Sequence, residues 1–342
     1  MEKTESKLFS VAKKYAKRYF VDALSAMGLG LFSSLIIGLI LSQISKIPYL
    51  GFLAQFSEVV SASSPVVGGA IGAAIAWGLK AKPLVIFSSV VTGAFGYSVG
   101  GPVGAYVAAV VGEEIGRLVS GKTKVDIVIS PMVTIISGGV AGILVGPPVQ
   151  ALMSGLGTVI NTATTLSPLP MGILVSVIVG LVLTAPISSA ALCIMLDLTG
   201  LAAGAATVGC CAQMIGFAVT SFKDNGWGGL ISQGLGTSML QVGNIMKKPA
   251  ILLAPTLAGA VLGPISTCVF KLTNTAAGAG MGTSGLVGQF GTFAAMGNEN
   301  FWYTLLVVVF MHFILPAVIA LVFDFIFRKL GWVKDGDMKL SV

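Results

Sequence analysis

The segment Lys82–Gly93, KPLVIFSSVVTG, has a counterpart later in the chain in Ala185–Gly200, APISSAALCIMLDLTG. Both carry a proline at their second residue, both end on Thr-Gly, and the residues between are apolar or small except for Asp197. Similar landmarks surround the two segments in the same order. These landmarks are Pro65, Lys124, Pro131 and Gly146-Pro147 for the first, and Pro170, Lys248, Pro255 and Gly263-Pro264 for the second. We interpret the pattern as an internal duplication.

The composition places this duplicated core in a membrane. Hydrophobic residues make up 55% of the 342 residues, charged residues make up 10%, and the mean hydropathy is +0.95. These values exclude a soluble domain. Duplicated membrane cores with broken helices are typical of transporters, whose solute lies where the copies meet. We therefore expect an all-α polytopic membrane protein with ten to twelve transmembrane or re-entrant segments.

The basic residues show how the chain is oriented. The formal net charge is +7, and the lysines and arginines cluster at the ends of apolar segments instead of forming a separate basic domain. Examples are Lys13-Lys14, Lys247-Lys248 and Arg328-Lys329. By the positive-inside rule, this distribution predicts that both termini are cytoplasmic. It also favours membrane lipids over nucleic acid as the surroundings of the basic residues.

Alternation of apolar and polar stretches divides the chain into parts. We expect an amphipathic helix on the inner leaflet (1–20), a first span and connector (21–64), one membrane repeat (65–148), a connecting segment (149–169), a second repeat (170–270), a Gly-rich re-entrant loop (271–300), a last span (301–330) and a cytoplasmic tail (331–342). Within the first repeat, Gly100-Gly101-Pro102 and Pro147-Pro148 are expected to end helices.

The stretch 271–300 is the most unusual part of the sequence. It contains no charge between Lys271 and Glu299, so it is too apolar for a loop in water, and it is too rich in glycine for an ordinary helix. A re-entrant loop that lines a cavity fits both properties. Its candidate solute-binding side chains are Asn274, Thr283, Ser284 and Gln289. Tight helix packing through small residues is the alternative reading.

Two ionisable residues fall inside apolar segments. A carboxylate at membrane depth costs about 2.5–3.5 kcal/mol on insertion scales, so Asp197 should face a cavity or a partner. The alternative for Asp197 is a helix end, capped by Thr199 or water. His312 is the only histidine and is a candidate for solute or proton binding, with simple packing as the alternative. Glu113 and Arg117 are expected to form a surface pair with i,i+4 spacing.

Three polar residues at segment ends complete the candidate solute site. Asn298 and Glu299 precede the aromatic run Phe301-Trp302-Tyr303, a combination that suits sugar binding. An interfacial loop with an aromatic belt explains the same residues. Asp224 lies in a polar turn where the second copy is longer, and a solvated turn is its alternative reading.

Three features of the chain resemble the membrane component, EIIC, of bacterial phosphotransferase-system (PTS) sugar permeases. They are GAGMGTSGLVGQFGT (Gly278–Thr292), KDNGWGG (Lys223–Gly229) and the repeated proline landmarks. The likeness extends from Tyr19 to Leu330 and is greatest to a stand-alone EIIC-like family that includes the perfringolysin regulator PfoR. It implies a dimeric permease fold in a bacterial plasma membrane, with a sugar site that opens to the cytoplasm.

The chain departs from this family in ways that bear on its chemistry. It offers no soluble region for a phosphohistidine-bearing IIA domain or a phosphocysteine-bearing IIB domain, so phosphotransferase activity would need separate IIA and IIB proteins. No catalytic constellation or metal-ligand spacing is visible, and we expect no cofactor and no metal. The leading hypothesis is a permease that binds and translocates a sugar or related hydroxylated solute. The alternative is a membrane-embedded solute sensor that transports nothing.

Overall fold

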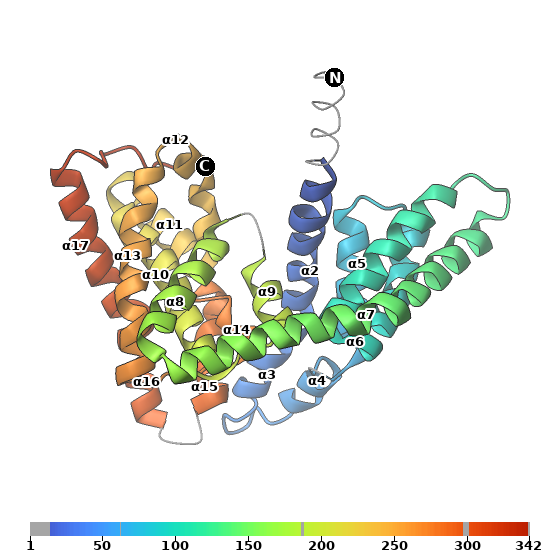
Figure 1. The fold of residues 1–342 in the computed structure, drawn as a ribbon, viewed down its shortest axis with the longest axis horizontal. Coiled ribbons are helices and arrows are strands. Elements are labelled where there is room, and N and C mark those ends of the chain that lie inside the picture. Colours follow the sequence, from blue (N-terminus) through green and yellow to red (C-terminus); the bar gives the residue numbers. More distant parts are fainter. Residues whose placement is uncertain (1–13, 62, 186–187, 297–300, 341–342) are drawn as a thin grey trace. The chain divides into compact units, whose positions relative to one another are not determined.

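The computed structural model describes residues 14–61, 63–185, 188–296 and 301–340, and their regular structure is helical (Figure 1). Six of the described helical stretches are long and apolar enough to cross a membrane. These stretches are Lys14–Ile44, Pro83–Val119, Asp126–Leu166, Gly200–Thr220, Pro249–Val269 and Phe301–Lys329. The expected all-α polytopic class is confirmed. The chain divides into unit 1, Met1–Ser154, and unit 2, Gly155–Val342.

Unit 1 begins with one long helix and continues with helices of very different length. Its elements are η1 (Lys17–Ala23), α2 (Leu24–Leu31), η2 (Phe32–Ile36), α3 (Ile37–Ile44), α4 (Leu53–Val59), α5 (Pro65–Gly78), α6 (Pro83–Val119) and α7 (Asp126–Leu166), which runs on into unit 2. The first four are consecutive turns of the same helix.

Helix α6 consists of two halves that fold back on each other at Gly100 and Gly101. Both glycines have non-helical backbone angles, and the φ of +58° at Gly101 is one that glycine adopts readily. A Cβ atom on Gly96 would lie 2.4 Å from the carbonyl oxygen of Gly104. Further from the turn, Gly116 lies beside the side chain of Val85. The predicted break at Gly100-Gly101-Pro102 is confirmed, and it produces an antiparallel hairpin.

Helix α7 contradicts the expected helix end at Pro147-Pro148. It runs unbroken from Asp126 to Leu166 with three prolines inside. The φ near −65° that proline imposes is compatible with a helix, so the loss is confined to the missing backbone donor and a local bend. Membrane helices tolerate such losses because neighbouring groups satisfy the freed carbonyls.

A network of four charged residues joins η1 to the end of α6 in unit 1. The expected pair Glu113–Arg117 is present, with an N–O distance of 3.8 Å. Glu113 is however fully buried, so the expectation of a surface pair is wrong. The difference arises from Arg18, whose Nη2 lies 3.2 Å from Glu113 Oε2 and whose Nε lies 2.5 Å from Glu114 Oε1. Arg18 is distant in sequence, which is why helical spacing alone does not reveal it.

Replacing Arg18 tests this network. We expect Arg18→Ala to lower the free energy of unfolding by about 3 kcal/mol, because it removes the principal partner of a buried carboxylate. The measurement is thermal unfolding of the purified protein in detergent. In Arg18→Ala/Glu113→Gln the buried charge is also absent, so the double variant should be more stable than Arg18→Ala alone. A double variant that is less stable than either single variant would contradict the pairing.

Unit 2 contains the remaining helices, several of them short. They are α8 (Pro168–Thr184), α9 (Ser189–Met195), α10 (Gly200–Thr220), α11 (Phe222–Ile231), η3 (Ser232–Gly236), η4 (Ser238–Gln241), α12 (Val242–Lys247), η5 (Pro249–Leu252), α13 (Leu253–Pro264), η6 (Ile265–Val269), α14 (Ala276–Ala279), η7 (Ser284–Leu286), α15 (Val287–Met296), α16 (Phe301–Val309), η8 (Phe310–Ile314) and α17 (Leu315–Lys329).

Helix α10 is the centre of unit 2 (Figure 1). In its most apolar stretch 89% of the residues are buried, against at most 50% in the other five candidate spans. Glycine allows this enclosure, because a Cβ atom on Gly209 would lie 1.9 Å from the carbonyl oxygen of Ser176 on α8. The hydroxyl of Ser176 in turn donates to the carbonyl of Gly259 on α13 at 2.9 Å. Small residues thus bring α8, α10 and α13 to backbone contact.

Two interrupted segments lie against the first half of α10. The segment that holds Asp197 is not a continuous helix: α9 ends at Met195, and α10 starts at Gly200. The break follows from the backbone, since Asp197 and Gly200 both have positive φ. The hydroxyl of Ser189, at the start of α9, donates to the carbonyl of Gly280 at 2.5 Å. The Gly-rich stretch, which contains Gly280, therefore packs beside α9, the helix that precedes the break at Asp197.

A single methyl group should disrupt the contact between α8 and α10. We expect Gly209→Ala to lower the melting temperature of the detergent-solubilised protein and its yield in membranes, because the new Cβ would overlap the backbone of α8. Gly243→Ala in α12 is the matched control, since a Cβ there meets no atom within 4 Å. Equal melting temperatures for the two variants would contradict the close approach.

Candidate functional site

The amide side chain of Asn274 forms hydrogen bonds between the Gly-rich stretch and α10. Asn274 is buried, and the two hydrogens of its Nδ2 are shared among three acceptors, Thr207 Oγ1 at 2.6 Å, the Gly288 carbonyl at 2.9 Å and Thr292 Oγ1 at 3.1 Å. Its backbone N–H donates to the carbonyl of Gly200 at 3.3 Å. Asn274 therefore joins the start of α10 to both ends of the loop that leads into α15.

The same stretch brings two predicted site residues into direct contact. Gln289 on α15 and His312 on η8 are both buried, and Gln289 Nε2 lies 3.0 Å from His312 Nδ1. Cys211 of α10 adds a weak contact, with its Sγ 3.7 Å from Gln289 Nε2. Gln289 Oε1 and His312 Nε2 are buried and have no hydrogen-bond partner among the described residues.

The contact determines what this pair can offer to a ligand. If the amide Nε2 of Gln289 donates to Nδ1, the neutral imidazole carries its proton on Nε2. One donor, His312 Nε2, and one acceptor, Gln289 Oε1, are then left over. Hydroxyl groups can satisfy both, because each hydroxyl can donate as well as accept. The arrangement suits an uncharged, hydroxylated ligand.

A second polar chain crosses α10 at Gln213, two positions after Cys211, and the sequence analysis does not predict it. Thr184 Oγ1 donates to Gln213 Oε1 at 3.2 Å and lies 2.9 Å from Ser238 Oγ. Gln213 Nε2 donates to Thr256 Oγ1 at 2.9 Å. Gln213 could have been found from the sequence, because an amide inside an apolar span needs an internal partner. The hydroxyls give no such signal, since they can bond to their own helix.

The structure places the other predicted residues away from the Gln289–His312 pair. Thr283 is buried and its hydroxyl donates to the carbonyl of Gly234 at 2.5 Å, while Ser284 is half-buried. Asp197 is exposed in the break before α10, where its carbonyl accepts from Asn161 Nδ2 at 3.1 Å. Asp224 accepts from the backbone N–H groups of Gly336 and Met338 in the C-terminal tail. Asn298 and Glu299 lie outside the described residues.

Asn161 is a further residue that sequence analysis missed. It lies in α7, in the stretch that was expected to be a plain connecting segment. Its Oδ1 accepts from the backbone N–H of Thr199 at 3.2 Å, so one amide side chain holds both sides of the break before α10. Nothing in the local sequence distinguishes this asparagine from the neighbouring threonines, because its partners are more than thirty positions away.

Replacing the amide NH2 group of Asn274 with a carboxylate oxygen tests the hydrogen bonds that join the Gly-rich stretch to α10. Asn274→Asp places a carboxylate against three oxygen atoms that now accept from an amide, so we expect it to lower the free energy of unfolding by about 3 kcal/mol. Thermal unfolding in detergent measures the effect. Asn161→Asp is the matched control at an exposed amide, where the loss should be smaller because water can replace the bonds. An Asn274→Asp protein as stable as the control would rule out donation by the Asn274 amide to these three oxygen atoms.

A comparison with protein families gives an independent view of the chain. The family model of the phosphotransferase system EIIC matches residues 21–340, nearly the whole sequence. No curated protein and no solved structure matches the chain. The family match agrees with the six apolar helices of spanning length, and together they make this a multi-pass plasma-membrane protein of the sugar-permease type. The chain belongs to the EIIC family of the phosphotransferase system.

Proposed function

We propose that this EIIC protein binds and translocates a sugar or a related hydroxylated solute in unit 2, beside Gln289 and His312. The observation that carries the proposal is the pair of buried polar atoms, Gln289 Oε1 and His312 Nε2, that have no partner among the described residues. Leaving a buried polar group unsatisfied costs about 1–3 kcal/mol. A chain that leaves two such atoms on contacting side chains needs a reason, and solute hydroxyls provide one.

The surroundings of the pair favour a neutral solute over a charged one. Uncharged polar side chains lie near the pair: Cys211 contacts Gln289, and Thr207 on the same helix bonds to Asn274. A charged solute buried here would require an opposite charge to offset its desolvation. Sugars and polyols are uncharged and present several hydroxyl groups, so they match these surroundings.

Access to the pair requires a movement, and the Gly-rich stretch is the element we propose to move. Gly282, Gly285 and Leu286 have positive φ. Glycine adopts this backbone conformation readily, whereas a residue with a side chain, such as Leu286, adopts it only rarely. Gly282 also lies against the backbone of α10, where its Cβ would be 2.7 Å from the carbonyl carbon of Cys210. Release of this contact would expose Gln289, consistent with alternating access around a broken segment.

The remaining expectations belong to the same proposal. We infer that the two repeats rock against each other during transport and that the protein is a homodimer. Asp197, Asn298 and Glu299 remain candidate solute ligands in other states of the cycle. Separate IIA and IIB proteins would supply phosphotransfer if the solute is phosphorylated. The basic segment ends support cytoplasmic termini.

A ligand screen by thermal unfolding tests the site. A ligand at a hundred times its Kd adds about 2.7 kcal/mol to the stability of the folded state. We expect a sugar or polyol to raise the melting temperature of the wild-type protein by a few degrees, and Gln289→Ala to abolish the shift. Gln233→Ala is the matched control, because it removes another buried glutamine of unit 2, whose Nε2 donates to Ser221 and Gly229.

The outcomes separate the functions. A shift that survives Gln289→Ala and His312→Ala would disprove the site, and the absence of any hydroxylated ligand would disprove the solute class. Uptake of the ligand into proteoliposomes would show transport. Binding without uptake would favour the solute sensor. Accumulation as a phosphate ester, only when IIA and IIB proteins are added, would place the chain in a complete phosphotransferase system.

A further inference from the structure

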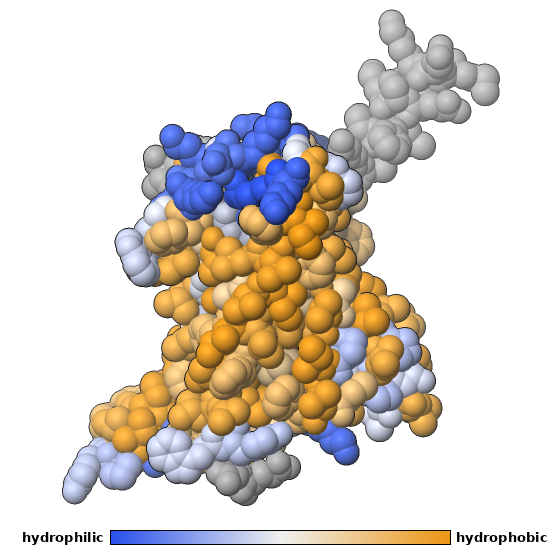
Figure 2. Space-filling model, turned by 90° about the vertical axis from the view of Figure 1, so that its left-hand side faces the viewer, coloured by the Kyte–Doolittle hydropathy of each residue, from blue (hydrophilic) through white to orange (hydrophobic). Residues whose placement is uncertain are grey.

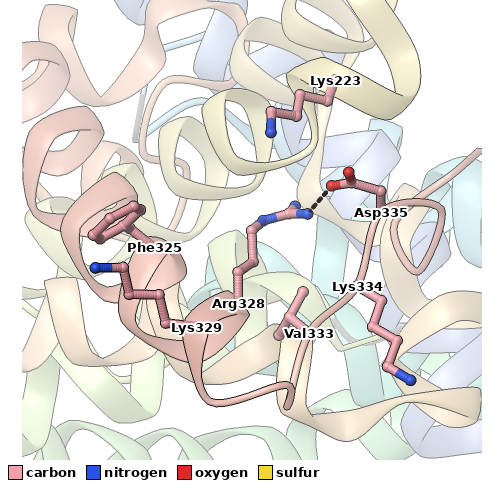
Figure 3. Close-up of a pocket in the computed structure, with 7 residues that line it drawn as sticks. All are labelled: Lys223, Phe325, Arg328, Lys329, Val333, Lys334 and Asp335. Atoms are coloured by element: carbon pink, nitrogen blue, oxygen red, sulfur yellow. Dashed lines mark hydrogen bonds and ion pairs between the residues drawn. The ribbon is translucent and has the colours of Figure 1, made fainter.

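Two adjoining hollows lie at the end of α17 in unit 2. The outer one, of about 460 Å³, is lined by Lys223, Phe325, Arg328, Lys329, Val333, Lys334 and Asp335 (Figure 3). The inner one, of about 320 Å³, is lined by Val219, Thr220, Lys223, Leu321, Asp324, Phe325 and Arg328. Lys223, Phe325 and Arg328 line both, so the two hollows are continuous. Together they are large enough for a small ligand.

The outer hollow carries uncompensated positive charge. Arg328 is paired, because its Nε lies 2.6 Å from Asp324 Oδ2 and its Nη1 bonds to Asp335. Lys223, Lys329 and Lys334 have no carboxylate within ion-pair distance in the part of the chain that the structure describes. Figure 3 shows Arg328 at the centre of the hollow, bonded to Asp335, with Lys329 next to Phe325 on α17. The ammonium of Lys329 lies 4.5 Å from the centroid of the Phe325 ring.

The inner hollow has a different character. Its wall includes the side chains of Val219 on α10 and of Leu321 and Phe325 on α17. Leu321 is 45% exposed and Phe325 is 59% exposed, and both lie on a helix of spanning length. Figure 2 shows hydrophilic residues gathered at one end of this face, above a broad hydrophobic surface. We call the outer hollow, with Lys223, Arg328, Lys329 and Lys334, the cup. It opens onto the groove, which is the part of the inner hollow lined by Val219, Leu321 and Phe325.

Aromatic side chains mark the level of the cup relative to the membrane. Trp332 is 51% exposed and stacks on Phe327, with ring centroids 5.5 Å apart. Trp227 is 72% exposed and meets Phe222 edge to face at 5.3 Å. Exposed tryptophans beside the end of a span are typical of the membrane–water interface, where lipid phosphates lie. Headgroup depth is therefore the position we expect for the lysines that line the outer hollow.

The wall of the cup is held in place by the C-terminal tail. Asp224 accepts from the backbone N–H groups of Gly336 and Met338 at 2.9 and 3.2 Å. Asn225 accepts from the N–H of Leu340 at 2.8 Å and donates to the carbonyl of Met338 at 2.9 Å. These bonds fix the segment that carries Lys334 and Asp335. A preformed cup loses little conformational entropy when it binds.

We propose that this site binds an anionic phospholipid, with the phosphate at the outer hollow, which Lys223, Lys329 and Lys334 border from different sides, and one acyl chain along Leu321 and Phe325. Basic pockets at the ends of membrane helices recognise anionic headgroups in this way. A free anion would use the cup alone, and a neutral lipid would use the groove alone. The combination of the two selects an anionic lipid.

The test uses the full-length protein in neutral detergent, with a phosphatidylglycerol, a phosphatidylcholine of the same acyl chains, and glycerol 3-phosphate as probes. We expect the phosphatidylglycerol to raise the melting temperature more than the phosphatidylcholine, and glycerol 3-phosphate to have no effect. Lys223→Gln and Lys329→Gln should each weaken phosphatidylglycerol binding about fivefold. Lys247→Gln removes the same charge from an exposed position that lines neither hollow, and it should leave binding unchanged.

Leu321→Gln tests the groove separately and changes only an exposed side chain. It should weaken phosphatidylglycerol binding while the lysines of the cup remain. A stabilisation by glycerol 3-phosphate that depends on the same lysines would overturn the proposal in favour of a soluble anion. Equal stabilisation by the two lipids, or a phosphatidylglycerol effect that persists in Lys223→Gln/Lys329→Gln, would also overturn it.

Discussion

The enclosure of α10 is the constraint on which the structure of unit 2 depends. A membrane helix normally turns at least one side to lipid, whereas α10 meets protein on nearly every side. Its neighbours can approach only where side chains are small, and so Gly204 meets the backbone of Leu272 while Gly209 meets that of Ser176. The same enclosure allows polar side chains on α10, because neighbouring protein groups can form hydrogen bonds with them. Thr207 and Gln213 find partners on the surrounding elements and are never presented to hydrocarbon.

The interrupted segments follow from this arrangement. A continuous helix beside α10 would place a rigid rod of side chains against it, whereas short helices such as α9 and α14 let backbone groups approach directly. Their free ends are satisfied locally, by the side chains of Ser188 and Thr275 that accept from backbone N–H groups of the first turns. Irregular backbone inside a membrane protein is tolerated for that reason, and it brings the polar groups of the proposed site to the centre of unit 2.

Much of this architecture could be predicted from the sequence, and the rest could not for identifiable reasons. Composition predicts the membrane class, and the conformational freedom of glycine predicts the break in α6 at Gly101. Gln289 and His312 could each be recognised as polar residues in an apolar setting, but their contact depends on how α15 and η8 pack. The continuation of α7 through Pro147 could not be predicted, because a proline can lie within a helix as well as end one. Asp224 shows a further limit, since its partners in the tail are backbone groups that the sequence does not mark.

The position of α10 also has a consequence for how the protein is made. Its covering elements come from both sides of it in the chain, with α8 and α9 before it and α13 to α17 after it. When α10 has just been synthesised, α8 is already present, but most of its future neighbours, α13 and α17 among them, have not been made. Unit 2 therefore cannot complete its packing helix by helix during translation. A chain stopped before α17 would lack one of the helices that cover α10, so the full enclosure of α10 forms only after α17 has been made.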